Sequence, residues 1–324
     1  MISLRCYEQV KILRDQKMNA VSTDHQKLNV FHEQLMKEVV QIALEKVESE
    51  WGKPPTHFAF FVMGSAGRRE QSVWSDQDHG IVYEATAGFQ DYFLTLGKEI
   101  TKGLAIVGYE QCDGDVMASN PLWCKSSLAW ELQILDWLDE NDWESLRYFS
   151  TFFDSRVLLG EEELLLKLKN VAFSKLDEEP RLYKRLYENV GFIKKGVGIF
   201  GQLLPEEKGE DTGTINLKQT MFFPYVNSLR MLAILEKIPY PSTIDRFLHL
   251  PKEYEIIKSY EANFSKLLTY RLYFQRNAVS YKKVHLLHVK LMSSREKECL
   301  KELMKNGRKL FKETKDIIDK RCSS

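Results

Sequence analysis

The chain has 324 residues, which is long for a single core and suits two domains of ordinary size. Hydrophobic residues make up 44% of it and charged residues 28%, which is typical of globular proteins and excludes disordered and fibrous classes. Lysine and arginine total 46, as do aspartate and glutamate, so the formal net charge is zero. This balance argues against a protein that binds nucleic acid or an anionic membrane by bulk attraction.

The net charge of zero conceals two regions of opposite sign. Residues 110–179 hold 16 acidic and 6 basic side chains, whereas residues 265–324 hold 6 acidic and 16 basic ones. We therefore expect a local positive surface near the C-terminus, which could dock the acidic middle of the chain, a second subunit or an acidic acceptor.

Targeting and redox signals are weak. The longest apolar run, at residues 58–63, is far shorter than the roughly 20 residues that span a bilayer. The first residues, MISLRC, reach a charge at once and lack the apolar core of a signal peptide. The five scattered cysteines form no Cys-x-x-Cys pair, which predicts reduced thiols. We expect a cytoplasmic protein.

The first half of the chain mixes helical and strand patterns. Apolar steps of three and four predict an amphipathic helix over residues 22–52, which ends at Gly52 before two prolines. The run HFAFFVM at residues 57–63 predicts a buried strand. A second strand at residues 78–84, a helix at 89–106 and a third strand around 107–117 follow.

Helical patterns dominate the rest of the chain. They predict helices at residues 128–138, 143–159, 161–176 and 181–204, a polar loop at 205–213, and further helices from about residues 219, 243, 254 and 284. A long amphipathic helix is predicted over residues 293–322. We expect it to pack on the other helices, and a partner or dimer interface is the alternative.

These elements predict an α+β protein with three parts. Residues 1–52 form an N-terminal helical segment, and residues 53–160 form an α/β domain with a small mixed β-sheet. Residues 161–324 form an all-α helical bundle domain.

The segment with the clearest chemistry is GSAGRREQSVWSDQD, at residues 64–78. Gly64 and Gly67 leave room for backbone N–H groups to approach a phosphate, and Ser65 offers a hydroxyl. Asp76 and Asp78 lie two apart on a predicted strand, so both carboxylates face one side, where they can hold Mg²⁺. Either feature alone is usually structural. Together, after a buried strand, they predict phosphoryl or nucleotidyl transfer.

This segment resembles the signature of the DNA polymerase β-like nucleotidyltransferase superfamily. It is most similar to bacterial nucleotidyltransferase-like proteins related to the PII-protein uridylyltransferases. Later blocks resemble the family in the same order, and the resemblance covers about residues 30–280, including a helical C-terminal substrate-binding domain. These blocks are CDGDVMASNPLW (112–123), FDSR (153–156), INLK (215–218), FPYVNSLR (223–230) and RLYFQ (271–275).

The resemblance implies roles for individual residues. Asp76 and Asp78 would bind Mg²⁺, or Mn²⁺, while Gly64, Ser65 and Gly67 hold the nucleotide phosphates and Arg68 adds a charged contact to them. The superfamily usually has a third carboxylate on a neighbouring strand. Asp113 and Asp115 are the candidates for it, and Asp154 is a weaker one.

Several other residues also have expected roles. Lys218 and Arg230 fall in the part that the resemblance assigns to substrate binding, where phosphate contacts and structural salt bridges are equally expected. His79 should point away from Asp78 and pack against the other face of the sheet. Trp123, Trp130 and Trp137 are expected in the core.

The leading hypothesis is a Mg²⁺-dependent nucleotidyltransferase of the uridylyl- or adenylyltransferase type. It would move a nucleoside monophosphate from an NTP to a hydroxyl of a protein, such as a PII-like signalling protein, or of a small molecule. The alternative is a catalytically degenerate fold that binds nucleotide as a sensor or regulatory module. A structural scaffold would leave the motif unexplained. We expect no membrane or nucleic-acid partner and leave a homodimer open.

Overall fold

The computed structural model describes residues 6–84, 88–275, 278 and 280–323. The chain divides into two compact units, Met1–Lys175 and Leu176–Ser324, each of which is described by itself. The first holds a small mixed sheet with helices and the second is mainly helical, so the predicted α+β class is confirmed. Among the described helices, none is both long and apolar enough to cross a membrane.

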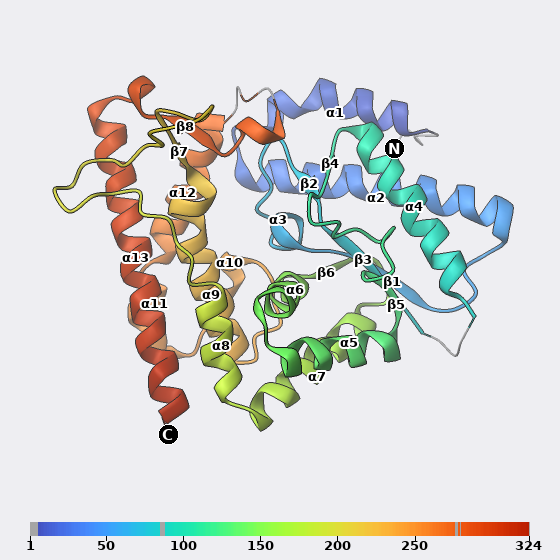
Figure 1. The fold of residues 1–324 in the computed structure, drawn as a ribbon. Helices are drawn as coiled ribbons and strands as arrows, with labels where there is room; N and C mark the ends of the chain where they lie inside the picture. The colour runs from blue at the N-terminus through green and yellow to red at the C-terminus, as the bar shows by residue number, and fades with distance from the viewer. Residues whose placement is uncertain (1–5, 85–87, 276–277, 279, 324) are drawn as a thin grey trace. The chain divides into compact units, whose positions relative to one another are not determined.

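A four-stranded sheet forms the centre of the first unit (Figure 1). Its order is β5 (Cys124–Ser126), β3 (His79–Tyr83), β1 (Phe58–Val62) and β6 (Arg156–Gly160). Strand β1 runs antiparallel to both β3 and β6, whereas β3 runs parallel to β5. Every residue of β1 and β3 is buried, because both faces of the sheet are covered, and this explains the unbroken apolar run.

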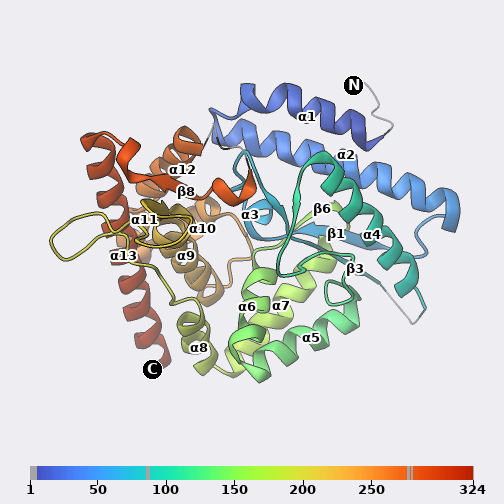
Figure 2. The same ribbon diagram turned by 45° about the horizontal axis from the view of Figure 1, so that its top comes forward.

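Helices cover the two faces of this sheet, as Figure 2 shows. The helices α1 (Tyr7–Val21), α2 (His25–Trp51) and α4 (Gln90–Val107) share one core with the β1 side chains Phe58, Phe60 and Val62. On the other face, Phe61 contacts rings from α5 (Ser127–Glu140) and α6 (Trp143–Phe153). The helices predicted over residues 22–52 and 89–106 are thus confirmed as α2 and α4, whereas α1 was not predicted.

The aromatic core of the second face contains three of the tryptophans. Trp123, Trp130 and Trp137 are at most 5% exposed, as predicted. The indole N–H of Trp130 donates to the carbonyl oxygen of Ile81 at 2.9 Å, which fixes α5 against β3. All five cysteines are free thiols, also as predicted.

Two elements of the first unit differ from the prediction. The helix expected over residues 143–159 ends at Phe153, and residues 156–160 form β6 at the edge of the sheet. Gly160 has φ +99°, and a Cβ there would lie 2.1 Å from the carbonyl oxygen of Phe58, so this strand needs glycine at its end. The strand expected around residues 107–117 is reduced to β4 (Glu110–Gln111). It pairs in parallel with β2 (Asp76–Gln77) in a separate ladder.

The second unit is built from helices around α9 (Phe223–Leu235). From Pro224 onward every residue of α9 is buried, as in a helix surrounded by others. The other helices are α8 (Arg181–Asn189), α10 (Thr243–His249), α11 (Glu255–Lys258), α12 (Glu261–Gln275) and α13 (Ser294–Ser323), and α7 (Glu162–Glu178) connects the units in sequence. A π-helix at Lys218–Phe222 precedes α9, and short 3-10 turns lie at Lys252–Tyr254, Tyr281–Lys283 and Val289–Leu291.

The long C-terminal helix packs on its own unit, as predicted. The Tyr225 hydroxyl of α9 donates to the carbonyl oxygen of Leu303 at 2.9 Å. The Tyr187 ring of α8 stacks on Phe311, with centroids 4.6 Å apart.

Two predicted helices of the second unit are wrong in extent or type. The helix expected over residues 181–204 ends at Asn189, before a segment that contains several glycines. The helix expected from residue 284 is replaced by β8 (Leu286–His288), which pairs antiparallel with β7 (Thr214–Asn216). The helical bundle therefore carries one two-stranded ladder.

Candidate active site

A tight turn follows β1 and forms the short helix α3 (Gly64–Gly67). Gly64 has φ +53°, and a Cβ at this position would lie 2.2 Å from Oδ2 of Asp78. A Cβ on Gly67 would lie 1.9 Å from the carbonyl oxygen of Asp154. Both glycines are therefore required by close approach, Gly64 to a carboxylate and Gly67 to a neighbouring backbone.

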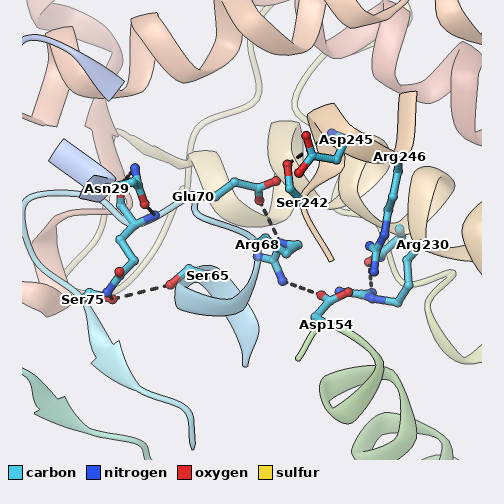
Figure 3. A network of polar contacts seen from close by, with 12 residues as sticks. Asn29, Ser65, Arg68, Glu70, Ser75, Asp154, Arg230, Ser242, Asp245 and Arg246 are labelled. Atoms are coloured by element: carbon cyan, nitrogen blue, oxygen red, sulfur yellow. Dashed lines mark hydrogen bonds and ion pairs between the residues drawn. The ribbon is translucent and has the colours of Figure 1, made fainter. Parts of the chain in front are cut away.

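Most residues of the connection between the turn and β2 are buried, and the connection is hydrogen-bonded (Figure 3). The Oγ atoms of Ser65 and Ser75 lie 3.5 Å apart, and the Ser65 carbonyl oxygen accepts from the N–H of Glu70 at 2.8 Å. The N–H of Gln71 donates to Oδ1 of Asn29 in α2 at 2.8 Å. These contacts fix the Ser65 hydroxyl next to the start of the strand that carries Asp76.

Asp76 and Asp78 lie on one side of β2 and its continuation, as the alternation of a strand requires. The Asp78 carbonyl oxygen accepts from the N–H of Met63 at 2.7 Å, so Asp78 is tied to the end of β1 beside the turn. Both aspartates are half-buried. The parallel register pairs Asp76 with Glu110, and Gln77 with Gln111.

A third side chain joins the two carboxylates. Asp76, Asp78 and Cys112 each present one ligand atom, and these atoms all lie within 4.8 Å of one another. Cys112 follows β4 directly, and the parallel register continued by one residue places it beside Asp78. Two carboxylates and a thiol at this spacing fit a divalent cation. The glycine at position 64 is consistent with such a site, because the absence of a Cβ leaves space for the Asp78 carboxylate.

The candidates for a third carboxylate lie outside this group. Asp113 and Asp115 are exposed on the turn after Cys112. Oδ2 of Asp115 accepts from Asn120 Nδ2 at 2.9 Å. Asp154 is fully buried and accepts from Arg68 Nη1 at 2.6 Å. Sequence reasoning missed Cys112, because a thiol is not a usual partner of Mg²⁺ and only the strand register places it here.

Arg68 is held by two carboxylates (Figure 3). Its Nε lies 2.8 Å from Oε2 of Glu70 and its Nη1 lies 2.6 Å from Oδ2 of Asp154, and the side chain is 13% exposed. Burial opposes the charge of Arg68, but Glu70 and Asp154 outweigh it and raise the pKa of the guanidinium above its usual range. Arg68 therefore ties the turn to the end of α6, a role that the sequence did not predict, and its expected contact with a phosphate stays a prediction.

His79 has a structural position, as predicted. Its Nδ1 accepts from the N–H of Ala118 at 3.1 Å, its Nε2 lies 3.1 Å from Oε1 of Gln77, and its ring packs on Phe60. Burial lowers the pKa of His79 to about 3, so the ring is neutral near pH 7. Through its hydrogen bond with Ala118, His79 holds in place the segment that follows Cys112.

The two predicted substrate-binding residues lie in different surroundings within the second unit. Lys218 is exposed at the first residue of the π-helix, whereas Arg230 is buried in α9 and donates to Asn227 Oδ1 at 2.7 Å. Arg271 of α12 lies over the Phe222 ring, 4.6 Å from its centroid. Burial, Lys218 and Arg271 together lower the pKa of His285 to about 3. Lys218 and Arg271 thus place two positive charges near a neutral His285, a residue that the sequence had not singled out.

A glycine–serine turn after a buried strand thus faces a strand with two carboxylates, which is the combination that phosphoryl or nucleotidyl transfer needs. Comparison with protein families agrees. Residues 8–144 match the family model described as "Putative nucleotidyltransferase DUF294", and residues 180–316 match "Putative nucleotidyltransferase substrate binding domain". The chain belongs to this nucleotidyltransferase family, as the sequence resemblance indicated. No curated protein matches the chain.

Proposed function

We propose that the chain is a divalent-metal-dependent nucleotidyltransferase that moves a nucleoside monophosphate from an NTP to a hydroxyl group. The observation that supports this most strongly is the close approach of the Asp78 carboxylate to Gly64. It means that a metal held by Asp76 and Asp78 would lie next to phosphates held by the turn. Mg²⁺, or Mn²⁺, bound there would neutralise negative charge on the phosphates.

The residues of the turn would position the nucleotide. The backbone at Gly64 and Gly67 would allow the phosphates to approach closely, and the Ser65 hydroxyl would donate to a phosphate oxygen. Arg68 would hold the turn in place through Glu70 and Asp154. The acceptor oxygen attacks the α-phosphorus, the bond to the bridging oxygen breaks, and pyrophosphate leaves.

A base must take the proton of the acceptor hydroxyl. We propose Asp113 or Asp115 for this role, because both are exposed carboxylates on the turn that follows Cys112. One of the two variants, Asp113→Asn or Asp115→Asn, would then lose transfer and keep NTP binding. Full activity in both variants would place the base elsewhere.

The second unit would bind the acceptor. Lys218 is exposed, and Lys218 and Arg271 both place positive charge near His285, which suits an anionic substrate. We propose that Lys218 contacts that substrate and that Arg230 supports α9 through Asn227. The resemblance to PII uridylyltransferases favours UMP or AMP as the transferred group and a PII-like signalling protein as the acceptor, with a small molecule as the other option.

The test is transfer of label from each of the four α-³²P-labelled NTPs, with Mg²⁺, to a PII-type protein and to a lysate. Thermal unfolding with NTP and Mg²⁺ measures binding in parallel. Asp76→Asn and Asp78→Asn should lose both transfer and the metal-dependent stabilisation, while Asp91→Asn, an exposed aspartate in the first turn of α4, should keep them. Equal transfer by the wild type and by all three variants would refute the proposal.

A nucleotide-binding regulatory module without turnover is the second candidate. It is favoured by one observation, which is that the third member of the ligand group is the thiol of Cys112 and not a carboxylate. In this case NTP and metal would stabilise the protein, and Asp76→Asn would abolish that effect, but no label would be transferred.

A further inference from the structure

We infer that Cys112 is a ligand of the metal site and that it makes this site prefer a thiophilic divalent cation, such as Zn²⁺, to Mg²⁺. This inference concerns the site on which the proposed function rests. It assigns a third ligand, and with it a second class of metal, to the pair of aspartates.

The strand ladder places the thiol at the site. Because β2 and β4 are parallel and Asp76 pairs with Glu110, the residues that follow run side by side on the same face. Cys112 and Asp78 are those residues, and their side chains are hydrogen-bonded. The three ligand atoms within 4.8 Å of one another thus come from two short strands that are fixed to each other.

The surroundings of the sulfur suit a metal-bound thiolate. The chain turns sharply after Cys112, whose carbonyl oxygen accepts from the N–H of Asp115 at 3.0 Å. Within this turn the backbone N–H groups of Gly114 and Val116 hydrogen-bond to the sulfur. Such donors stabilise negative charge on a ligating sulfur and fix its direction.

Binding of a divalent cation at this spacing would involve the thiol directly. The thiol releases its proton to water as the metal–sulfur bond forms, so the affinity for such a cation depends on pH.

The ligand atoms determine which cation binds most tightly. Mg²⁺ takes oxygen ligands and gains little from sulfur, whereas Zn²⁺ and Cd²⁺ bind thiolate strongly. Three protein ligands with a fourth position open is the pattern of zinc sites that admit a further ligand. Zn²⁺ would therefore compete with Mg²⁺ for Asp76 and Asp78, and the protein would respond to thiophilic metal through its nucleotide site.

Cd²⁺ titration of the full chain tests this inference, because a cadmium–thiolate bond gives an ultraviolet charge-transfer band. We expect the band to saturate at one equivalent in the wild type, to be lost in Cys112→Ser and to remain in Cys6→Ser, a control at another partly exposed cysteine. Zn²⁺ affinity should fall at least about tenfold in Cys112→Ser, while Mg²⁺ affinity stays within about threefold. Thermal unfolding without metal checks that the variant is folded.

A second experiment, the alkylation of Cys112, uses the wild type alone. Zn²⁺ should protect Cys112 from alkylation, as mapped by mass spectrometry, and Mg²⁺ should not. Absence of the band in the wild type, its persistence in Cys112→Ser, or alkylation of Cys112 unchanged by Zn²⁺ would overturn the inference. These readouts do not depend on transfer: a thiolate band without transfer would leave only the proposed function in doubt, and transfer without the band would reject only the role of Cys112.

Discussion

Replacing Gly64 by alanine should damage the metal site more than the fold. The new Cβ would lie 2.2 Å from Oδ2 of Asp78, whereas real Cβ contacts are not shorter than 3.0 Å. The Asp78 carboxylate must therefore move by about 0.8 Å, the difference between these distances. A displacement of about 1 Å can lower a reaction rate by about 100-fold, and we expect a loss of this order in transfer.

The cost in stability should be smaller. Gly64 has φ +53°, and an alanine in this left-handed region costs about 1–2 kcal/mol of unfolding free energy. Gly52→Ala is the matched control, because Gly52 also has a positive φ, of +82°, but has nothing within 4 Å of an added Cβ. It should lose stability without losing Mg²⁺ affinity or transfer.

The assays are guanidinium unfolding, metal-dependent thermal stabilisation and single-turnover transfer from a labelled NTP. Wild-type Mg²⁺ binding and label transfer in Gly64→Ala would contradict this prediction. An equal loss of metal affinity in Gly52→Ala would also contradict it, since backbone strain alone would then account for the effect.

Three further predictions concern single side chains. Arg68→Ala leaves buried carboxylates without their cation and should lower the unfolding free energy by about 3–5 kcal/mol, against less than about 1 kcal/mol for the exposed Arg181→Ala, by urea denaturation. The folded pKa of His79, about 3, lies below the unfolded value, so protonation favours unfolding as pH falls below about 6.5. Stability should therefore drop by about 2 kcal/mol more between pH 7 and pH 5 than in His79→Gln, and equal slopes would contradict this. Ser65→Ala should weaken NTP binding by about three- to tenfold in calorimetry without a change in melting temperature, because it removes one hydrogen bond to phosphate.

Local patterns were sufficient to predict the turn at Gly64 and the shared side of Asp76 and Asp78, which form the centre of the candidate site. The run at residues 58–62 is apolar because β1 is buried on both faces, and Gly64 is glycine because a carboxylate lies against it. The alternation of a strand placed Asp76 and Asp78 on one side. Each of these features depends on residues that are close together in the sequence.

The features that were missed depend on pairing between distant segments. The edge strand β6 is a strand because it pairs with β1, while its own apolar spacing also suits a helix. Arg68 meets Asp154 across 86 residues, and no local pattern reveals that ion pair. Cys112 lies beside Asp78 only through the ladder of β2 and β4, each two residues long.

We propose that one site couples a nucleotide to a divalent cation through the turn at Gly64 and the two aspartates. The most direct measurement is the affinity for a non-hydrolysable NTP analogue, by calorimetry, as Mg²⁺ is varied. We predict that Mg²⁺ tightens nucleotide binding in the wild type and has no effect in Asp76→Asn/Asp78→Asn. The same affinity in Mg²⁺ and in EDTA, or an undiminished effect of Mg²⁺ in the double variant, would contradict the claim.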